Sequence, residues 1–173
     1  PRASNTEIYL CETVSFAIIL LIVFGKNALV DFHSRNVRIC FLGNYDGLNP
    51  DVIEAIEHAH DVTKDNTGCT LALCLNYGGH QERVDAAKAL LQVGANPDEL
   101  TVEDFAKHLY EPTIPPVDLI IRSSGEQRLS GFMLWRAAYS ELYFFEKNWP
   151  DFTTEDFDDA LADYASRQRR YGK

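Results

Sequence analysis

The sequence has little positive charge. Its 173 residues include 16 lysines and arginines against 26 aspartates and glutamates, which gives a formal net charge of −10 at pH 7. Proteins that bind nucleic acids through the phosphates need a surplus of basic side chains, so this composition excludes that class of partner. A small anionic ligand is compatible with it, because a local cluster of arginines outweighs distant acidic groups.

Long apolar runs are also missing. The most apolar window, "VSFAIILLIVFG" at 14–25, has about ten uninterrupted apolar residues, whereas a membrane-spanning helix needs about 20. Neither a basic stretch nor a small-residue cleavage site accompanies it, so we do not predict a signal peptide. We expect a buried helix here, or the wall of an apolar cavity.

The four cysteines lack the spacing of a metal or redox site. No pair forms a CxxC motif, and two of them fall in strand-like runs. This pattern predicts reduced, partly buried thiols in a cytoplasmic protein. The cysteines are Cys11, Cys40, Cys69 and Cys74. The chain also contains no GxxxxGK loop and no nucleophile elbow, so a generic phosphate-binding hydrolase is a poorly supported alternative.

Apolar runs that end at turn-forming residues predict three buried strands: "NVRICFLGN" (36–44), "CTLALCLN" (69–76) and "PPVDLII" (115–121). Segments with apolar residues at helical spacing follow the first two strands and occur again near the end of the chain. The first of these helices has Asn49 and Pro50 as its start signal, the second covers "RVDAAKALLQVG" (83–94), and the last starts at Thr153 with Asp156. Thr101 with Asp104 predicts the start of a further short helix. The alternation predicts an α/β fold with a mostly parallel β-sheet flanked by helices, in a single domain from residue 1 to 173.

Two loops follow the carboxyl ends of predicted strands, where sheets of this kind bind ligands. They are "NYGGH" (76–80) and "RSSGEQRLS" (122–130). In the second loop, Arg122 and Arg128 can bind phosphate oxygens bidentately, and Ser130 can donate through its hydroxyl. These three residues predict a site for a diphosphate.

The small residues of this loop would also let backbone amides approach an anion, at Ser123 and Ser124. A second interpretation is that Arg122 and Glu126 form an ion pair that only closes the loop. The spacing of the residues does not separate the two interpretations.

Large apolar side chains dominate residues 132–145 and predict core. Glu141 is the exception, because a carboxylate beside Leu142 and Tyr143 is either exposed between apolar faces or directed at a cation or another subunit.

The segments "DLIIRSSGEQRLSGFMLWRAAYSELYF", "WPDF" and "RRYG" closely resemble the cis-prenyltransferases, the family of undecaprenyl diphosphate synthase and the short-chain Z-prenyl diphosphate synthases. "NVRICFLGN" and "LNYGGH" match the same family more loosely. The resemblance implies a dimeric α/β enzyme that condenses isopentenyl diphosphate with an allylic diphosphate, such as farnesyl diphosphate, with Mg²⁺ as cofactor. A homodimer is expected, with a heterodimer as the alternative. The expected location is the cytoplasm, with transient membrane association through the lipid product.

The resemblance also implies roles for individual residues. Arg122, Arg128 and Ser130 would hold isopentenyl diphosphate. Glu141 would help to place Mg²⁺, across the dimer interface. Arg170 and Gly172 match the family's terminal Arg-x-Gly element, which reaches the diphosphate site of the partner subunit, and the apolar run at 14–24 would line a tunnel for the growing chain.

The sequence departs from the family in one important element. The family's Asp-Gly-Asn-x-Arg loop, which carries the essential aspartate and binds the allylic diphosphate, has no match in these residues. No catalytic residue is therefore assigned. We expect that this segment is absent from the chain; the alternative is a non-catalytic partner subunit of a heteromeric cis-prenyltransferase. We also expect no condensation of labelled isopentenyl diphosphate with farnesyl diphosphate by these 173 residues, and detectable product would contradict this.

Overall fold

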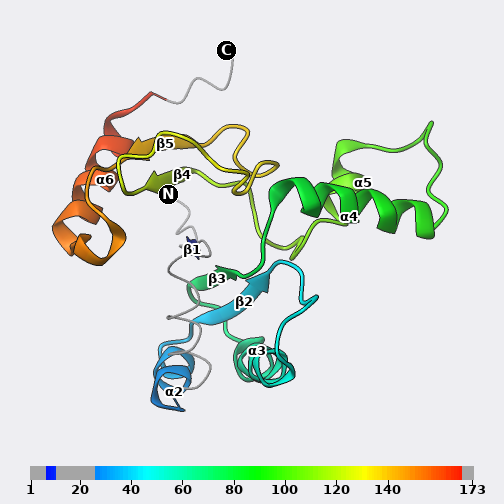
Figure 1. Cartoon of the computed structure of the whole chain (residues 1–173), viewed down its shortest axis with the longest axis horizontal. Coiled ribbons are helices and arrows are strands. Elements are labelled where there is room, and N and C mark those ends of the chain that lie inside the picture. The colour runs from blue at the N-terminus through cyan, green and yellow to red at the C-terminus, as the bar shows by residue number, and fades with distance from the viewer. Residues whose placement is uncertain (1–6, 11–25, 169–173) are drawn as a thin grey trace. The chain divides into compact units, whose positions relative to one another are not determined.

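A computed structural model describes residues 7–10 and 26–168 of the chain (Figure 1). It divides into two compact units, Pro1–Pro112 and Thr113–Lys173, and each is described by itself. The prediction that residues 1–173 form one domain stays a prediction. The apolar run at 14–25, with the tunnel expected there, lies outside the described residues.

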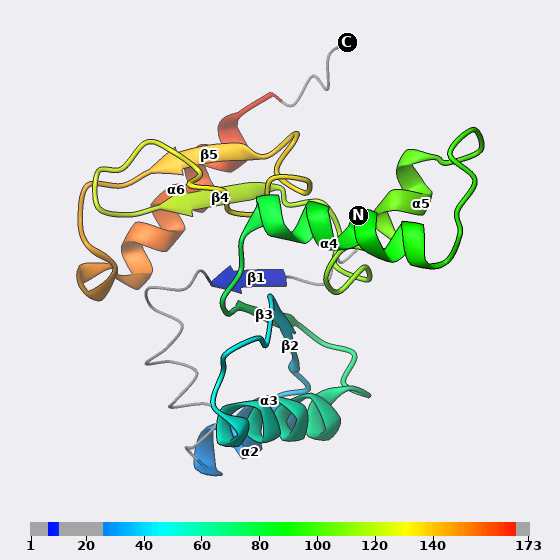
Figure 2. The same cartoon turned by 45° about the vertical axis from the view of Figure 1, so that its right-hand side comes forward.

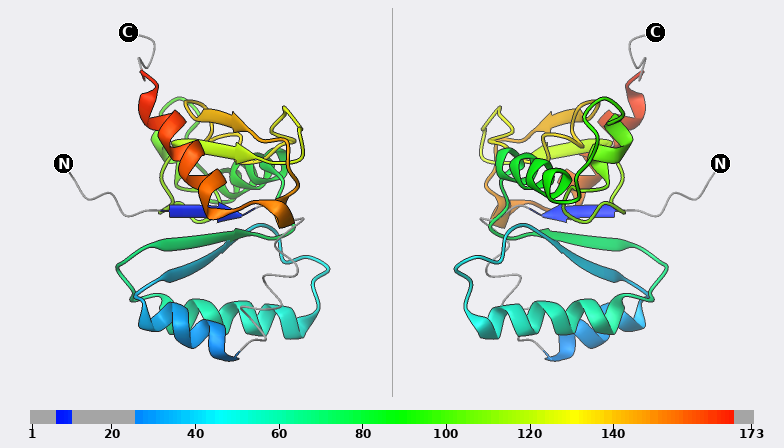
Figure 3. Two further views of the ribbon diagram at one scale, coloured as in Figure 1. Left: turned by 90° about the vertical axis from the view of Figure 1, so that its left-hand side faces the viewer. Right: turned by 90° about the vertical axis from the view of Figure 1, so that its right-hand side faces the viewer.

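The first unit contains a three-stranded sheet with β3 in its centre, and both β1 and β2 pair with β3 in parallel. Helices α2 and α3 lie on one side of this sheet and α4 on the other (Figure 3). In chain order the elements are β1 (Glu7–Leu10), α2 (Lys26–Ser34), β2 (Arg38–Leu42), α3 (Pro50–Thr63), β3 (Thr70–Cys74), α4 (Gly79–Gln92) and α5 (Val102–Ala106).

Strands β2 and β3 carry the core of the first unit. Ile39 and Leu73 are fully buried, and they belong to one apolar cluster with Ile56 of α3. Burying a side chain of this size contributes about 1.5–3 kcal/mol. Both strands are buried along almost their whole length, as is usual in a parallel sheet covered on both faces. Such strands need a continuous apolar sequence, which is why these two could be predicted.

Both ends of α3 are fixed by side-chain hydrogen bonds. At its start, Asn49 Oδ1 accepts from the amide of Asp51 at 2.9 Å, as the N-cap prediction requires. At its end, the buried hydroxyl of Thr63 donates to Ala59 O at 2.8 Å and accepts from the amide of Ile39 at 3.0 Å. The bond from Ile39 joins α3 to β2.

The second unit is built on two parallel strands, β4 (Leu119–Arg122) and β5 (Glu141–Phe144), shown in Figure 2. A short 3-10 helix, η1 (Trp149–Asp151), and the helix α6 (Thr154–Ser166) follow. The third predicted strand is observed as β4, shorter and shifted toward Arg122 because Pro115 and Pro116 lie outside it. β5 was not predicted as a strand.

Every strand pairing in the described residues is parallel, in one sheet of three strands and one of two. The predicted α/β class is therefore confirmed. Capping boxes are present at Thr101 with Asp104 and at Thr153 with Asp156, again as predicted. None of the described helices combines the length and the apolar character that crossing a membrane requires.

Candidate functional site

The loop predicted to bind a diphosphate begins where β4 ends, at Arg122, and has an unusual backbone. Three residues other than glycine adopt positive φ within ten positions: Ser124 (72°), Ser130 (48°) and Met133 (49°). Each such residue costs on the order of 1 kcal/mol or more, and such residues cluster at ligand sites. The loop conformation must therefore be held by surrounding contacts.

The contacts come from the segment that continues β5. The amide of Ser124 donates to Lys147 O at 2.8 Å, and the amide of Gly125 donates to Phe145 O at 2.9 Å. Gly125 has a φ of +65°, and a Cβ atom there would lie 3.0 Å from Glu146 Oε2. The suggestion that the Ser124 amide binds an anion is therefore wrong, because a carbonyl already occupies it.

The charged side chains of the loop pair differently from the second interpretation given above. Glu126 forms an ion pair with Arg128, not with Arg122. The half-buried side chain of Arg122 has no hydrogen bond or ion pair within the part of the chain that the structure describes. The interpretation that Arg122 and Glu126 merely close the loop is thus wrong.

The structure places Arg122, Arg128 and Ser130 on one loop at the carboxyl end of β4. No hydrogen bond joins the three side chains among the described residues. The Arg128 side chain is 64% exposed, and Ser130 is exposed as well. The arrangement leaves one uncompensated guanidinium, one guanidinium with a partly buried counter-ion, and a hydroxyl. This is donor chemistry suited to phosphate oxygens.

Glu141, at the start of β5, is directed at a cation within its own unit. Its Oε2 accepts from Arg167 Nη1 at 2.9 Å, and the same Nη1 donates to Leu142 O at 3.1 Å. Arg167 Nη2 lies 2.5 Å from Asp163 Oδ2. Glu141, followed by Asp163, raises the pKa of the Arg167 guanidinium above its ordinary value, so this cation stays charged.

The described residues contain no cluster of three or more His, Cys, Asp or Glu side chains that could hold a metal ion. Mg²⁺ is often bound by only one or two carboxylates together with substrate phosphates. Glu141 could supply one such carboxylate, but its Oε2 already accepts a hydrogen bond from Arg167. Its role as a magnesium ligand stays a prediction, and so do the roles of Arg170 and Gly172, which lie outside the described residues.

The other predicted ligand loop, at 76–80, is tied to its neighbour. Asn76 Nδ2 donates to Asn44 O at 3.1 Å, so this side chain joins the loops after β2 and β3. A Cβ atom on Gly43 would lie 1.7 Å from Leu75 O, which shows how closely the two loops approach. The side chain of Asn76 therefore serves structure in the first unit.

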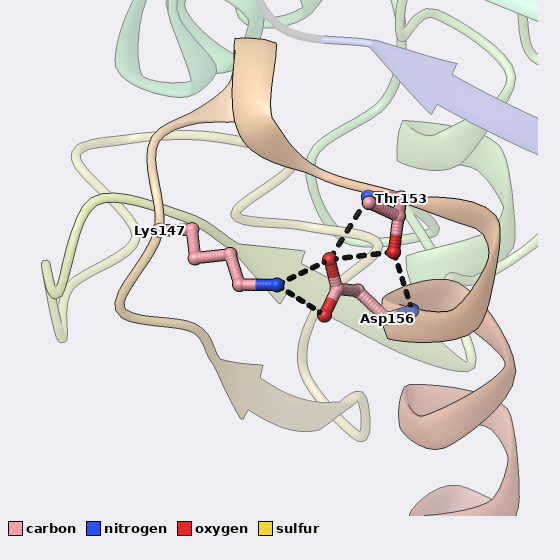
Figure 4. A network of polar contacts seen from close by, with 3 residues as sticks. All are labelled: Lys147, Thr153 and Asp156. Carbon is pink, nitrogen blue, oxygen red and sulfur yellow. Dashed lines mark hydrogen bonds and ion pairs between the residues drawn. The ribbon is translucent and has the colours of Figure 1, made fainter.

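Sequence reasoning missed two polar groups. Glu82 is fully buried in α4, where it accepts from Tyr77 Oη at 2.5 Å and from the amide of Tyr110 at 3.2 Å. In the second unit, Lys147 Nζ lies 3.0 Å and 3.1 Å from the two carboxylate oxygens of Asp156 (Figure 4). Neither contact has a signal in the sequence beyond the capping pattern at Asp156.

Comparison with known proteins identifies the family. A family model described as "Putative undecaprenyl diphosphate synthase" matches residues 12–172. The chain is 44% identical to isoprenyl transferase 2 of Corynebacterium glutamicum over 82% of the chain and 60% of that protein. It is 42% identical to the isoprenyl transferase of Thermotoga maritima over 93% of the chain and 70% of that protein. The chain thus spans only 60% and 70% of the length of these two relatives.

Solved structures agree with the sequence matches. A probable undecaprenyl diphosphate synthase from Campylobacter jejuni is similar with a TM-score of 0.81 and 30% identity, over 98% of this chain and 84% of that one. Lavandulyl diphosphate synthase from Lavandula x intermedia, in complex with dimethylallyl diphosphate, is similar with a TM-score of 0.77 and 29% identity, over 96% of this chain and 78% of that one. The chain belongs to the undecaprenyl diphosphate synthase family of prenyltransferases.

Proposed function

We propose that the protein acts in cis-prenyl transfer, and that the loop 122–130 binds isopentenyl diphosphate. One observation carries the proposal: Arg122 is uncompensated within the described residues and stands at the carboxyl end of a parallel strand, on the same loop as Arg128 and Ser130. A diphosphate would supply the anionic oxygens that Arg122 lacks among the described residues. The family of the chain and the printed names of its relatives support the assignment.

In the proposed reaction, the diphosphate group leaves the allylic substrate as the double bond of isopentenyl diphosphate attacks the allylic carbon. A carbon–carbon bond forms, and loss of a proton yields a new cis double bond. Arg122, Arg128 and Ser130 would hold the isopentenyl diphosphate group in place while its other end reacts. Bound Mg²⁺ would neutralise charge on the departing diphosphate, with Glu141 as its protein ligand.

The allylic substrate is supported by a structural relative, because the lavandulyl diphosphate synthase structure contains dimethylallyl diphosphate. We extend to this chain a homodimeric state and a cytoplasmic location, with transient contact of the product with membranes. Sedimentation velocity of the purified protein tests the dimer. Fractionation of cells that produce the protein tests its location.

Calorimetric titration of the chain with isopentenyl diphosphate, and separately with a nucleoside diphosphate, tests the site. We expect isopentenyl diphosphate to bind, and the nucleotide to bind more weakly, since no nucleotide-binding loop is present. Failure to bind isopentenyl diphosphate, or equal affinity for the nucleotide, would overturn the assignment.

A further inference from the structure

The segment between β5 and α6, residues 145–152, contacts the diphosphate loop through its backbone. Lys147 O and Phe145 O accept the amides of Ser124 and Gly125, the two consecutive residues with positive φ. Because this conformation costs free energy, the loop keeps it only while those two carbonyls stay in place. The position of Lys147 therefore determines the path of the chain from Arg122 onward.

The side chain of Lys147 anchors this position to α6, as Figure 4 shows. Its ammonium contacts both carboxylate oxygens of Asp156, at 3.0 Å and 3.1 Å. Asp156 is itself fixed, since its Oδ2 accepts from the amide of Thr153 at 2.9 Å and from the Thr153 hydroxyl at 2.9 Å. The Asp156 side chain is only 12% exposed, so the ammonium meets a carboxylate with little freedom to move.

Contacts between aromatic rings within residues 145–152 stabilise the conformation of the same segment. Lys147 Nζ lies 5.4 Å from the centre of the Phe145 ring. The Phe145 and Phe152 rings meet edge to face at 5.1 Å, and Phe152 stacks on Trp149 at 5.1 Å. These contacts make 145–152 a stiff connection, so that a shift at Asp156 would reach the carbonyls that hold the loop.

The first unit contains a similar capping box with a different connection. At α5, Asp104 caps through Thr101 and pairs with Lys107 at 2.8 Å, but Lys107 follows it by three residues in the same segment. That ion pair can stabilise only its own helix. Lys147 precedes its aspartate by nine residues and lies outside the helix, so it joins two segments.

We propose that Lys147 is a positioning residue for the diphosphate loop, acting through its own main-chain carbonyl while its ammonium is held by Asp156. This inference rests on the proposed function of loop 122–130. The ammonium itself need not touch the substrate. Its role is to keep Ser124 and Gly125 in the conformation from which Arg122 and Arg128 reach one diphosphate.

The test compares Lys147→Met, Lys147→Arg and Asp156→Asn in the full 173-residue chain, with Lys107→Met as the matched control. Amide hydrogen exchange at Ser124 and Gly125 reports the loop, and calorimetry with isopentenyl diphosphate reports the site. For Lys147→Met we expect exchange and the dissociation constant each to rise about fivefold, as for loss of a partly exposed ion pair. Lys147→Arg should restore both values, because it keeps the charge and reaches the same carboxylate.

Asp156→Asn should reproduce the effect of Lys147→Met, since an asparagine can still accept from the Thr153 amide but lacks the charge. Lys107→Met should lower the melting temperature without changing exchange at Ser124 or the dissociation constant. If Lys147→Met and Asp156→Asn bind isopentenyl diphosphate as the wild type does, the inference is wrong. If the wild type does not bind it, the proposed function is wrong instead.

Discussion

Replacement of Arg128 with alanine probes the diphosphate loop, and the structure sets the size of the expected effect. A hydrogen bond to a charged group contributes about 1.5–3 kcal/mol. To bind a diphosphate, however, Arg128 must give up Glu126, a partly exposed ion pair that is worth about 0–1 kcal/mol. The net loss is then about 1–2 kcal/mol, or roughly fivefold to thirtyfold in the dissociation constant.

Isothermal titration with isopentenyl diphosphate at fixed ionic strength measures this loss. Glu126→Gln is the second variant to titrate. It releases Arg128 from its counter-ion and should tighten isopentenyl diphosphate binding by up to about fivefold. In the double variant, the effect of Glu126→Gln should disappear, since the guanidinium it would release is gone. Arg35→Ala is the matched control, as Arg35 is an exposed arginine of the first unit that pairs with Asp31 of α2.

Two outcomes would contradict this reasoning. An unchanged dissociation constant for Arg128→Ala would show that Arg128 only closes the loop through Glu126. Weaker binding by Glu126→Gln would show that the carboxylate positions Arg128 rather than competing with the ligand.

The remaining predictions concern loop conformation and pH. Gly125→Ala should weaken isopentenyl diphosphate binding and lower the melting temperature, because Gly125 has a φ of +65° and an added Cβ would contact Glu146. The control is Gly47→Ala: Gly47 also has a positive φ, but an added Cβ would meet no other atom, so this variant should lower only the melting temperature. Hydrogen bonds from Lys107 and then Thr101 lower the pKa of Asp104 to about 2, below its ordinary value of 3.8, so the stability it contributes is present above pH 4 and is lost as the pH falls toward 2. The difference in melting temperature between the wild type and Asp104→Asn should therefore shrink over that range in thermal denaturation.

The elements that could be predicted from the sequence are those with strong local signals. The strand at 36–44 contains β2, and the strand at 69–76 contains β3, because both runs are apolar throughout and end at turns. The helix after Asn49 begins where its cap predicts. β5 was missed because its four residues lie inside an aromatic-rich segment that has no alternation of polar and apolar residues.

The site was predicted in its residues but not in its contacts. Arg122, Arg128 and Ser130 share a loop at the end of a strand, as the motif indicated. Which arginine Glu126 contacts depends on the backbone path through Ser124, whose positive φ has no signature in a sequence of small residues. Contacts that bring together residues far apart in the chain, such as Lys147 with Asp156, need the tertiary structure.

The two arginines of the loop should therefore contribute unequally to affinity. Arg128 begins from an ion pair, whereas the half-buried side chain of Arg122 has no polar partner among the described residues. The Arg122 guanidinium therefore gives up no existing hydrogen bond or ion pair there when a diphosphate binds. Its loss should cost the full value of a charge-assisted bond, about 1.5–3 kcal/mol, and Arg122→Ala should weaken isopentenyl diphosphate binding more than Arg128→Ala in the same titration. Arg122→Lys should recover only part of the affinity, because an ammonium cannot bind phosphate oxygens bidentately. Equal losses for the two alanine variants would show that the counter-ion of Arg128 costs nothing to displace.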